Sequence, residues 1–176
     1  MELVNVLEDE YLSKLNHSCA HMMAQAVKRL YPQAKFWVGP VIQDGFYYDM
    51  DLGDVSLNDA DLEKIAKEMK KIAKDGKRIV RKEVSKAEAQ EMFKDDPYKE
   101  DLIRDLEDGT ITVYSQGEFT DLCRGPHVDS VKECKNFKLL KHSGAYWKGD
   151  AKNKQMQRVY GICFPTKEEL EAHLEA

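Results

Sequence analysis

Two short stretches of the sequence carry residue types that can hydrolyse a bond or bind a metal. The first is HSCAH, in which His17 and His21 stand four positions apart, and the second is CRGPH, which repeats the spacing with Cys123 and His127. On a helix, residues four apart project from one face, so the two imidazoles of the first stretch are expected to point at one spot.

The second stretch cannot be helical, because it contains Gly125 and Pro126. Its cysteine and histidine are therefore expected at a strand end or in a tight loop, where chemistry is often placed. If the two stretches meet, the site holds three imidazoles and a thiol, which are also tetrahedral zinc donors.

Each pair alone is a weak signal, and Cys123 by itself is typical of a small buried residue. A zinc finger is excluded because the pairs lie about 100 residues apart, far beyond finger spacing. HSCAH also lacks the glutamate that zinc proteases place after the first histidine. A zinc site, a hydrolytic site and a coincidence of spacing remain open at this point.

Composition limits the class of protein. The chain has 176 residues, is 42% hydrophobic and 34% charged, and carries a net charge of −5, which argues against an indiscriminate nucleic-acid coat. No apolar run is long enough for a membrane span, and the acidic start does not resemble a secretory signal. Scattered cysteines at 19, 123, 134 and 163 fit a reducing cytoplasm.

Basic residues gather in two segments, 70–82 and 132–142. We interpret the first as a solvated face. Arg124 and the second segment are available for contacts with phosphates.

Periodicity and capping signals predict the elements that must position these residues. Helices are expected at 8–30, 57–75, 86–93 and 166–176, with a helix or turn at 96–106. Strands are expected around the Asp-Gly turn of 35–52, at 78–85, and within 110–128, 137–147 and 156–164. Pro40 predicts an edge or a bulge in the first strand.

The strands are not separated by regular crossover helices. This pattern predicts an α+β fold, with an antiparallel sheet packed against a long helix and several shorter ones. The oligomeric state cannot be deduced from the sequence.

Five motifs, in their order and spacing, carry a family resemblance. HSCAHMMAQAV, GPVIQDGFYYD, PYK, DLCRGPH and GAYWKGD resemble the editing, or second N-terminal, domain of bacterial threonyl-tRNA synthetases over roughly residues 11–175. Editing domains of alanyl-tRNA synthetases share the two spaced pairs but not GFYYD or GAYWKGD. The resemblance implies that residues 1–176 are a single tRNA-editing domain, excised or free-standing, since family members carry further domains on both sides.

The resemblance also implies a cytoplasmic activity, which is the hydrolysis of serine from mischarged threonine tRNA. A pocket discriminates one methyl group by only about 1–3 kcal/mol, so a second site that excludes threonine by steric clash is needed. The implied partners are the serine-bearing 3′ end of tRNA(Thr) and, for a fragment, the remaining synthetase domains. No cofactor is expected to be required.

Site residues carried over from the family fall into four roles. The resemblance implies that His17 and Lys99 handle the water, and that His21 and His127 orient this pair or bind the terminal adenosine. It implies that Asp121 holds the substrate ammonium, and that Tyr48 and Cys123 are walls of the serine pocket.

Three alternatives remain. Cys123 would be a nucleophile with His127 or His21 as its base. Zinc would be held by the four positions of the two pairs, although an ammonium at Lys99 would disfavour it if that side chain faces the site. The third alternative is a non-catalytic module that holds tRNA ends.

Overall fold

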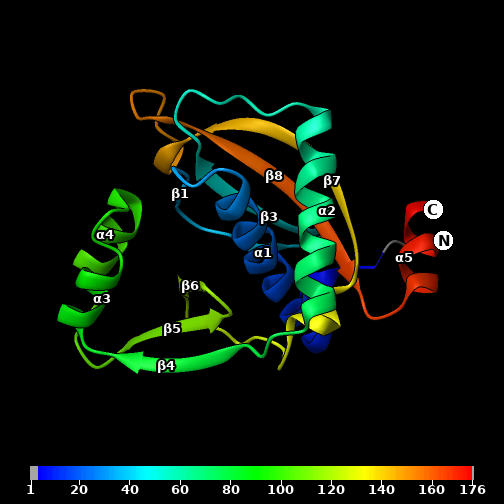
Figure 1. Cartoon of the computed structure of the whole chain (residues 1–176), viewed down its shortest axis with the longest axis horizontal. Helices are drawn as coiled ribbons and strands as arrows, with labels where there is room; N and C mark the ends of the chain where they lie inside the picture. Colours follow the sequence, from blue (N-terminus) through cyan, green and yellow to red (C-terminus); the bar gives the residue numbers. More distant parts are fainter. Residues whose placement is uncertain (1–3, 176) are drawn as a thin grey trace.

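Two antiparallel sheets, of five and three strands, form the framework of the protein (Figure 1). The computed structural model describes residues 4–175. Within that range no helix combines the length and apolar character needed to cross a membrane. The helices are η1 (Val6–Glu8), α1 (Glu10–Leu30), α2 (Asp59–Asp75), α3 (Lys86–Met92), α4 (Pro97–Arg104), η2 (Val131–Cys134), η3 (Trp147–Gly149) and α5 (Lys167–Glu175), where η denotes a 3₁₀ helix. The strands are β1 (Lys35–Phe36), β2 (Val41–Ile42), β3 (Gly45–Asp51), β4 (Val80–Val84), β5 (Ile111–Gln116), β6 (Phe119–Leu122), β7 (Asn136–Tyr146) and β8 (Gln155–Phe164).

The larger sheet has the order β1-β3-β8-β7, with β2 also paired to β3. All its pairs are antiparallel, for example Tyr48 opposite Val159 and Leu139 opposite Gly161. Pro40 lies between β1 and β2, so the edge beside β3 consists of two short pieces, as a proline without an N–H requires. This arrangement confirms the predicted α+β class.

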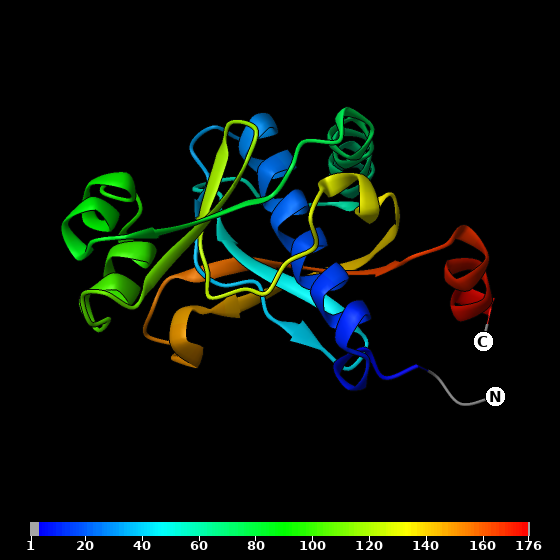
Figure 2. The same cartoon turned by 90° about the horizontal axis from the view of Figure 1, so that it is seen from below.

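Helix α1 is the central element of the core. It packs against α2, β3, β8 and η2, and Figure 2 shows α1 and α2 on the same side of the large sheet. Asp9 caps it by accepting from the Leu12 N–H at 2.8 Å. The apolar residues that recur at three- and four-residue steps along it, from Leu12 to Val27, are buried. Leu30 is 37% exposed because it ends the helix beyond the core.

Helix α2 begins and ends where its sequence signals predict. Asn58 and Asp61 form a capping box, and Gly76 adopts a left-handed conformation after the last turn. Its last turn points toward η2, against which it packs.

The smaller sheet, β4-β5-β6, carries α3 and α4 and has a hydrophobic cluster of its own. Figure 1 places these two helices at the opposite side of the molecule from α5. The segment predicted as a helix or turn is the helix α4, with Asp96 as its N-cap. Asp96 also accepts from the Phe36 N–H at 2.8 Å, which fixes the start of α4 against the larger sheet. This contact is what brings Lys99 toward the core.

The last helix begins as predicted, after Thr166. The Thr166 hydroxyl accepts from the Glu169 N–H at 3.2 Å. Helix α5 lies beside the ends of β7 and β8, away from α1 (Figure 1).

Candidate active site

Helix α1 brings His17 and His21 to the end of β6 and the loop that follows it. The neighbouring Asn16 exchanges two hydrogen bonds with the backbone of Cys163 in β8, at 2.9 and 3.0 Å, and so fixes the rotation of the helix. The rings of His17 and His21 lie 5.2 Å apart, edge to face. The spacing of four residues therefore places both imidazoles on one face, as predicted.

The CRGPH loop leaves the end of β6 and turns back over α1. Gly125 has φ of +78°, and a Cβ there would collide with the Tyr114 hydroxyl, so only glycine fits without a shift. The Gly125 N–H donates to the Cys123 sulfur at 3.2 Å. The Ser18 hydroxyl accepts from the Val128 N–H at 3.0 Å, which anchors the loop to the helix.

The two stretches meet. The Cys123 sulfur lies 3.3 Å from His17 Nε2 and 3.2 Å from His127 Nε2, and the ring of His127 lies 4.4 Å from that of His21. One donor atom from each of the four residues falls within 4.8 Å of the others. Bonds of about 2.0–2.3 Å to zinc would require the more distant donors to move closer together and the cysteine–histidine contacts to widen slightly. With that adjustment, the donor types and their number fit a tetrahedral ion.

The hydrogen bonds of Ser18 indicate the tautomer of His127. The serine hydroxyl donates its single proton to the Lys14 carbonyl at 2.8 Å, so His127 Nδ1, 3.0 Å away, must donate to it. His127 Nε2 then directs a lone pair at the Cys123 thiol. This nitrogen can accept a proton or a metal.

A buried charged group adjoins the four residues. Lys99 Nζ lies 2.7 Å from Asp121 Oδ1 and donates to the Trp37 carbonyl at 2.8 Å and to the Tyr48 hydroxyl at 3.1 Å. Tyr48 in turn donates to Asp121 Oδ2 at 2.6 Å, and His21 Nε2 lies 3.4 Å from the same oxygen. Lys99, Asp121 and Tyr48 are each at most 3% exposed.

Burial keeps the imidazoles and the thiol uncharged at neutral pH. It lowers the pKa of His17, against the attraction of Asp121. It lowers the pKa of His21 and of His127 still further, helped by their cationic or imidazole neighbours. Burial also raises the pKa of the Cys123 thiol to about 12. The ion pair of Lys99 and Asp121 sums to zero, so the whole site is nearly neutral.

Two surface pockets reach this group from different sides. One, of about 510 Å³, is lined by His17 together with Pro40, Val41 and Pro126. The other, of about 430 Å³, has Lys99 and Asp121 in its wall, together with Phe36 and Phe119. The buried polar residues thus lie between two openings to solvent.

The structure brings all seven predicted residues together, although it does not test their roles. Sequence reasoning missed three further groups: Ser18, which orients His127; the Trp37 carbonyl, which binds Lys99; and Tyr114, whose ring lies 4.4 Å from that of His127. Ser18 lies inside HSCAH and could have been found from its place beside His17. A backbone carbonyl leaves no signal in the sequence.

Comparison with known proteins gives two findings. Residues 111–160, which include Asp121, Cys123 and His127, match the family described as the threonyl and alanyl tRNA synthetase second additional domain. The chain is also 55% identical over 176 residues to the threonine–tRNA ligase of Staphylococcus carnosus and 53% identical over 174 residues to that of Acholeplasma laidlawii. These alignments cover 99% of this chain but 27% of each relative. The chain therefore spans about a quarter of the length of these ligases.

Proposed function

Because the chain is homologous to one region of the threonine–tRNA ligases and carries the second additional domain of the threonyl and alanyl tRNA synthetases, we propose that it edits mischarged threonine tRNA. The reaction is the hydrolysis of the ester that joins serine to the terminal ribose. The observation that supports it most directly is the meeting of three uncharged imidazoles with a buried Lys99–Asp121 pair beside an open pocket.

His17 is the proposed acceptor of the proton from the attacking water. It lines the larger pocket, so a water and the RNA end can reach it, and its lowered pKa keeps it unprotonated at neutral pH. The water oxygen bonds to the ester carbon and its proton passes to His17. The bond from that carbon to the ribose oxygen then breaks, and the ribose oxygen takes the proton that His17 accepted. The products are serine and tRNA with a free hydroxyl.

Lys99 is proposed to support the handling of the water by His17, because its ammonium holds Asp121 and Tyr48 in place. Its three N–H groups are already donated, so none is free for the reacting oxygen. Its ammonium is already bound by Asp121, Trp37 and Tyr48, so it is held in a fixed place as a positive charge. Lys99 thereby stays in the pair expected to handle the water.

Tyr48, Cys123 and His21 are proposed to form the wall that excludes threonine. Tyr48 is 1% exposed and is held by two hydrogen bonds, so it cannot move aside easily for an extra methyl group. A rigid wall is what a site needs when it must reject a larger look-alike.

The two catalytic alternatives, a nucleophilic Cys123 and a bound zinc ion, differ in how well they fit the chemistry of these residues. A nucleophilic Cys123 would need a thiolate, and a thiol with a pKa of about 12 is a poor one at neutral pH. Zinc held by His17, His21, Cys123 and His127 would supply a Lewis acid for the ester carbonyl when bound. The expected repulsion of zinc by Lys99 is weakened, because Asp121 neutralises the ammonium at 2.7 Å.

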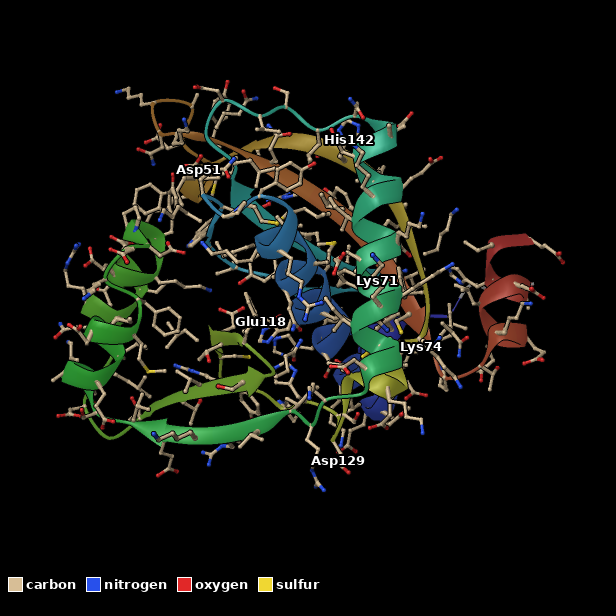
Figure 3. The ribbon with its side chains drawn as sticks, in the orientation of Figure 1. Asp51, Lys71, Lys74, Glu118, Asp129 and His142 are labelled. Carbon is tan, nitrogen blue, oxygen red and sulfur yellow. The ribbon has the colours of Figure 1, made fainter. Side chains whose placement is uncertain are left out.

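Deacylation of Ser-tRNA(Thr) and of Thr-tRNA(Thr) by the whole chain tests the proposal. We expect loss of serine only, with His17→Ala lowering the rate by about 10²–10⁴-fold. His142→Ala is the matched control, because His142 lies on β7 beside the start of α2, away from the site (Figure 3). Equal rates on both substrates, or no effect of His17→Ala, would contradict the proposal. Loss of activity with a chelator, restored by zinc, would favour the metal-dependent alternative.

A further inference from the structure

The two basic segments of the sequence meet on one surface. Lys70 and Lys74 from the second half of α2, and Lys132 and Lys135 from η2 and its end, line a pocket of about 300 Å³. The fifth residue lining it is Ala73, so no carboxylate contributes to the wall. Figure 3 shows Lys74 projecting from α2 at the end nearest η2. We call these four side chains the lysine surface.

The charges of the lysine surface have no protein counter-ion. Within residues 4–175, none of the four lysines takes part in an ion pair. The neighbouring acid Glu133 is occupied elsewhere, because it accepts from the Tyr11 hydroxyl at 2.7 Å and from the Asp129 N–H at 3.1 Å. Four adjacent cations in a chain of net charge −5 create a local positive field that favours an anionic partner.

A short segment of chain joins the lysine surface to the candidate active site. His127 and Val128 end the loop of the site, and η2 begins three residues later at Val131. Ser130, between them, caps η2 and also donates to the Gly76 carbonyl at the end of α2. An RNA whose 3′ end lies at His17 would therefore run near these lysines.

We propose that the lysine surface binds the phosphodiester backbone of the RNA whose end enters the site. Compact ammonium groups on two adjacent elements suit a row of phosphates, which they neutralise without reading the sequence. The pocket offers no large apolar side chain for insertion into a lipid surface, so RNA is favoured over an anionic membrane. The inference depends on the proposed function only for the identity of the RNA.

The test measures binding of an RNA hairpin to the whole chain. The hairpin has the sequence of a threonine tRNA acceptor arm and carries no amino acid. Fluorescence anisotropy is recorded from about 50 to about 200 mM salt. Each lost phosphate contact lowers the slope of log affinity against log salt by about 0.7 for a single strand and about 0.9 for a B-form DNA duplex. Lys74→Gln with Lys132→Gln is expected to weaken binding several-fold and to reduce the slope by one to two, as an order-of-magnitude estimate.

The matched control is Lys152→Gln with Lys154→Gln, which removes the same charge. These exposed lysines lie in the turn between η3 and β8, at the far end of β7 from η2. The control is expected to keep the wild-type slope. An unchanged slope for Lys74→Gln with Lys132→Gln, or an equal loss in the control, would overturn the proposal, as would preferential binding to anionic vesicles.

The outcome can be separated from that of the proposed function. Binding of RNA that carries no amino acid needs no hydrolysis. The lysine surface can therefore be confirmed even if Ser-tRNA is never deacylated. Where hydrolysis occurs, Lys74→Gln with Lys132→Gln is expected to raise KM for Ser-tRNA and to leave kcat unchanged. Hydrolysis of a seryl ester of adenosine alone, which has no RNA backbone, should not change.

Discussion

Replacing Asp121 with asparagine should destabilise the protein far more than loss of a typical ion pair does. The carboxylate is 2% exposed and lies 2.7 Å from Lys99 Nζ, which is itself buried. Asparagine keeps the shape of the side chain but removes its charge. The ammonium then retains neutral acceptors only, namely the amide oxygen of asparagine, the Trp37 carbonyl at 2.8 Å and the Tyr48 hydroxyl at 3.1 Å, and has no counter-charge.

The size of the effect follows from the unpaired charge left behind. Removing one partner of a buried pair costs about 3–5 kcal/mol of the free energy of unfolding. For a chain of this length, that corresponds to a fall in Tm of about 6–20 °C. Adding Lys99→Met to Asp121→Asn removes the stranded cation, so the double variant should be more stable than Asp121→Asn alone, at a remaining cost of about 1–3 kcal/mol for the unpartnered Trp37 carbonyl.

Urea unfolding followed by circular dichroism, on both single variants and the double variant, measures this coupling. The control is Glu91→Gln, which breaks an ion pair with Lys94 of similar length, 2.9 Å, whose two side chains are more than half exposed. That change should cost less than about 1 kcal/mol. If Asp121→Asn costs no more than the control, or if the two single effects simply add, the argument from a buried charge is wrong.

Three further outcomes are expected. Burial lowers the pKa of the site histidines, so the unfolded chain binds protons that the folded chain does not. The free energy of unfolding is therefore complete above about pH 7 and falls as the pH drops through about 6.5, by up to about 1.4 kcal/mol per pH unit for each histidine. Urea midpoints between about pH 7.5 and about pH 5.5 measure this slope, and His127→Gln should reduce it. Gly125→Ala should lower stability more than Gly109→Ala, because both glycines have positive φ but only at Gly125 would the new Cβ meet Tyr114; equal losses of stability would show that backbone strain alone decides. Tyr48→Phe removes the hydroxyl that links Lys99 and Asp121 and should cost about 1–3 kcal/mol, checked by thermal unfolding against Tyr146→Phe, an exposed tyrosine.

Local signals predicted much of the fold. The starts of α2 and α3 follow from the caps Asn58 and Ser85, and the end of α2 follows from Gly76, because these residues satisfy backbone groups that the helix leaves unpaired. The Asp-Gly pair at 44–45 correctly indicates the turn into β3. Each of these features depends on a few neighbouring residues, so the sequence is sufficient to find it.

The placement of Lys99 could not be predicted in this way. It lies on a short helix whose sequence is as consistent with a turn, and its burial depends on Asp96 binding Phe36 in the other sheet. Asp121 and Tyr48 come from β6 and β3, so three elements distant in sequence form one hydrogen-bonded group. No periodicity encodes such a contact, and without the family resemblance a solvated lysine would have been the natural interpretation.

The saturation of Asp121 restricts how the proposed substrate can bind. Oδ1 is taken by Lys99, and Oδ2 accepts from Tyr48 and lies near His21. An ammonium group of serine cannot bind Oδ1 without displacing Lys99. It must therefore approach Oδ2 from the side of His21, where the contact is longest at 3.4 Å. In the proposed reaction, the geometry of the buried pair would therefore limit access to Asp121, in addition to the wall at Tyr48.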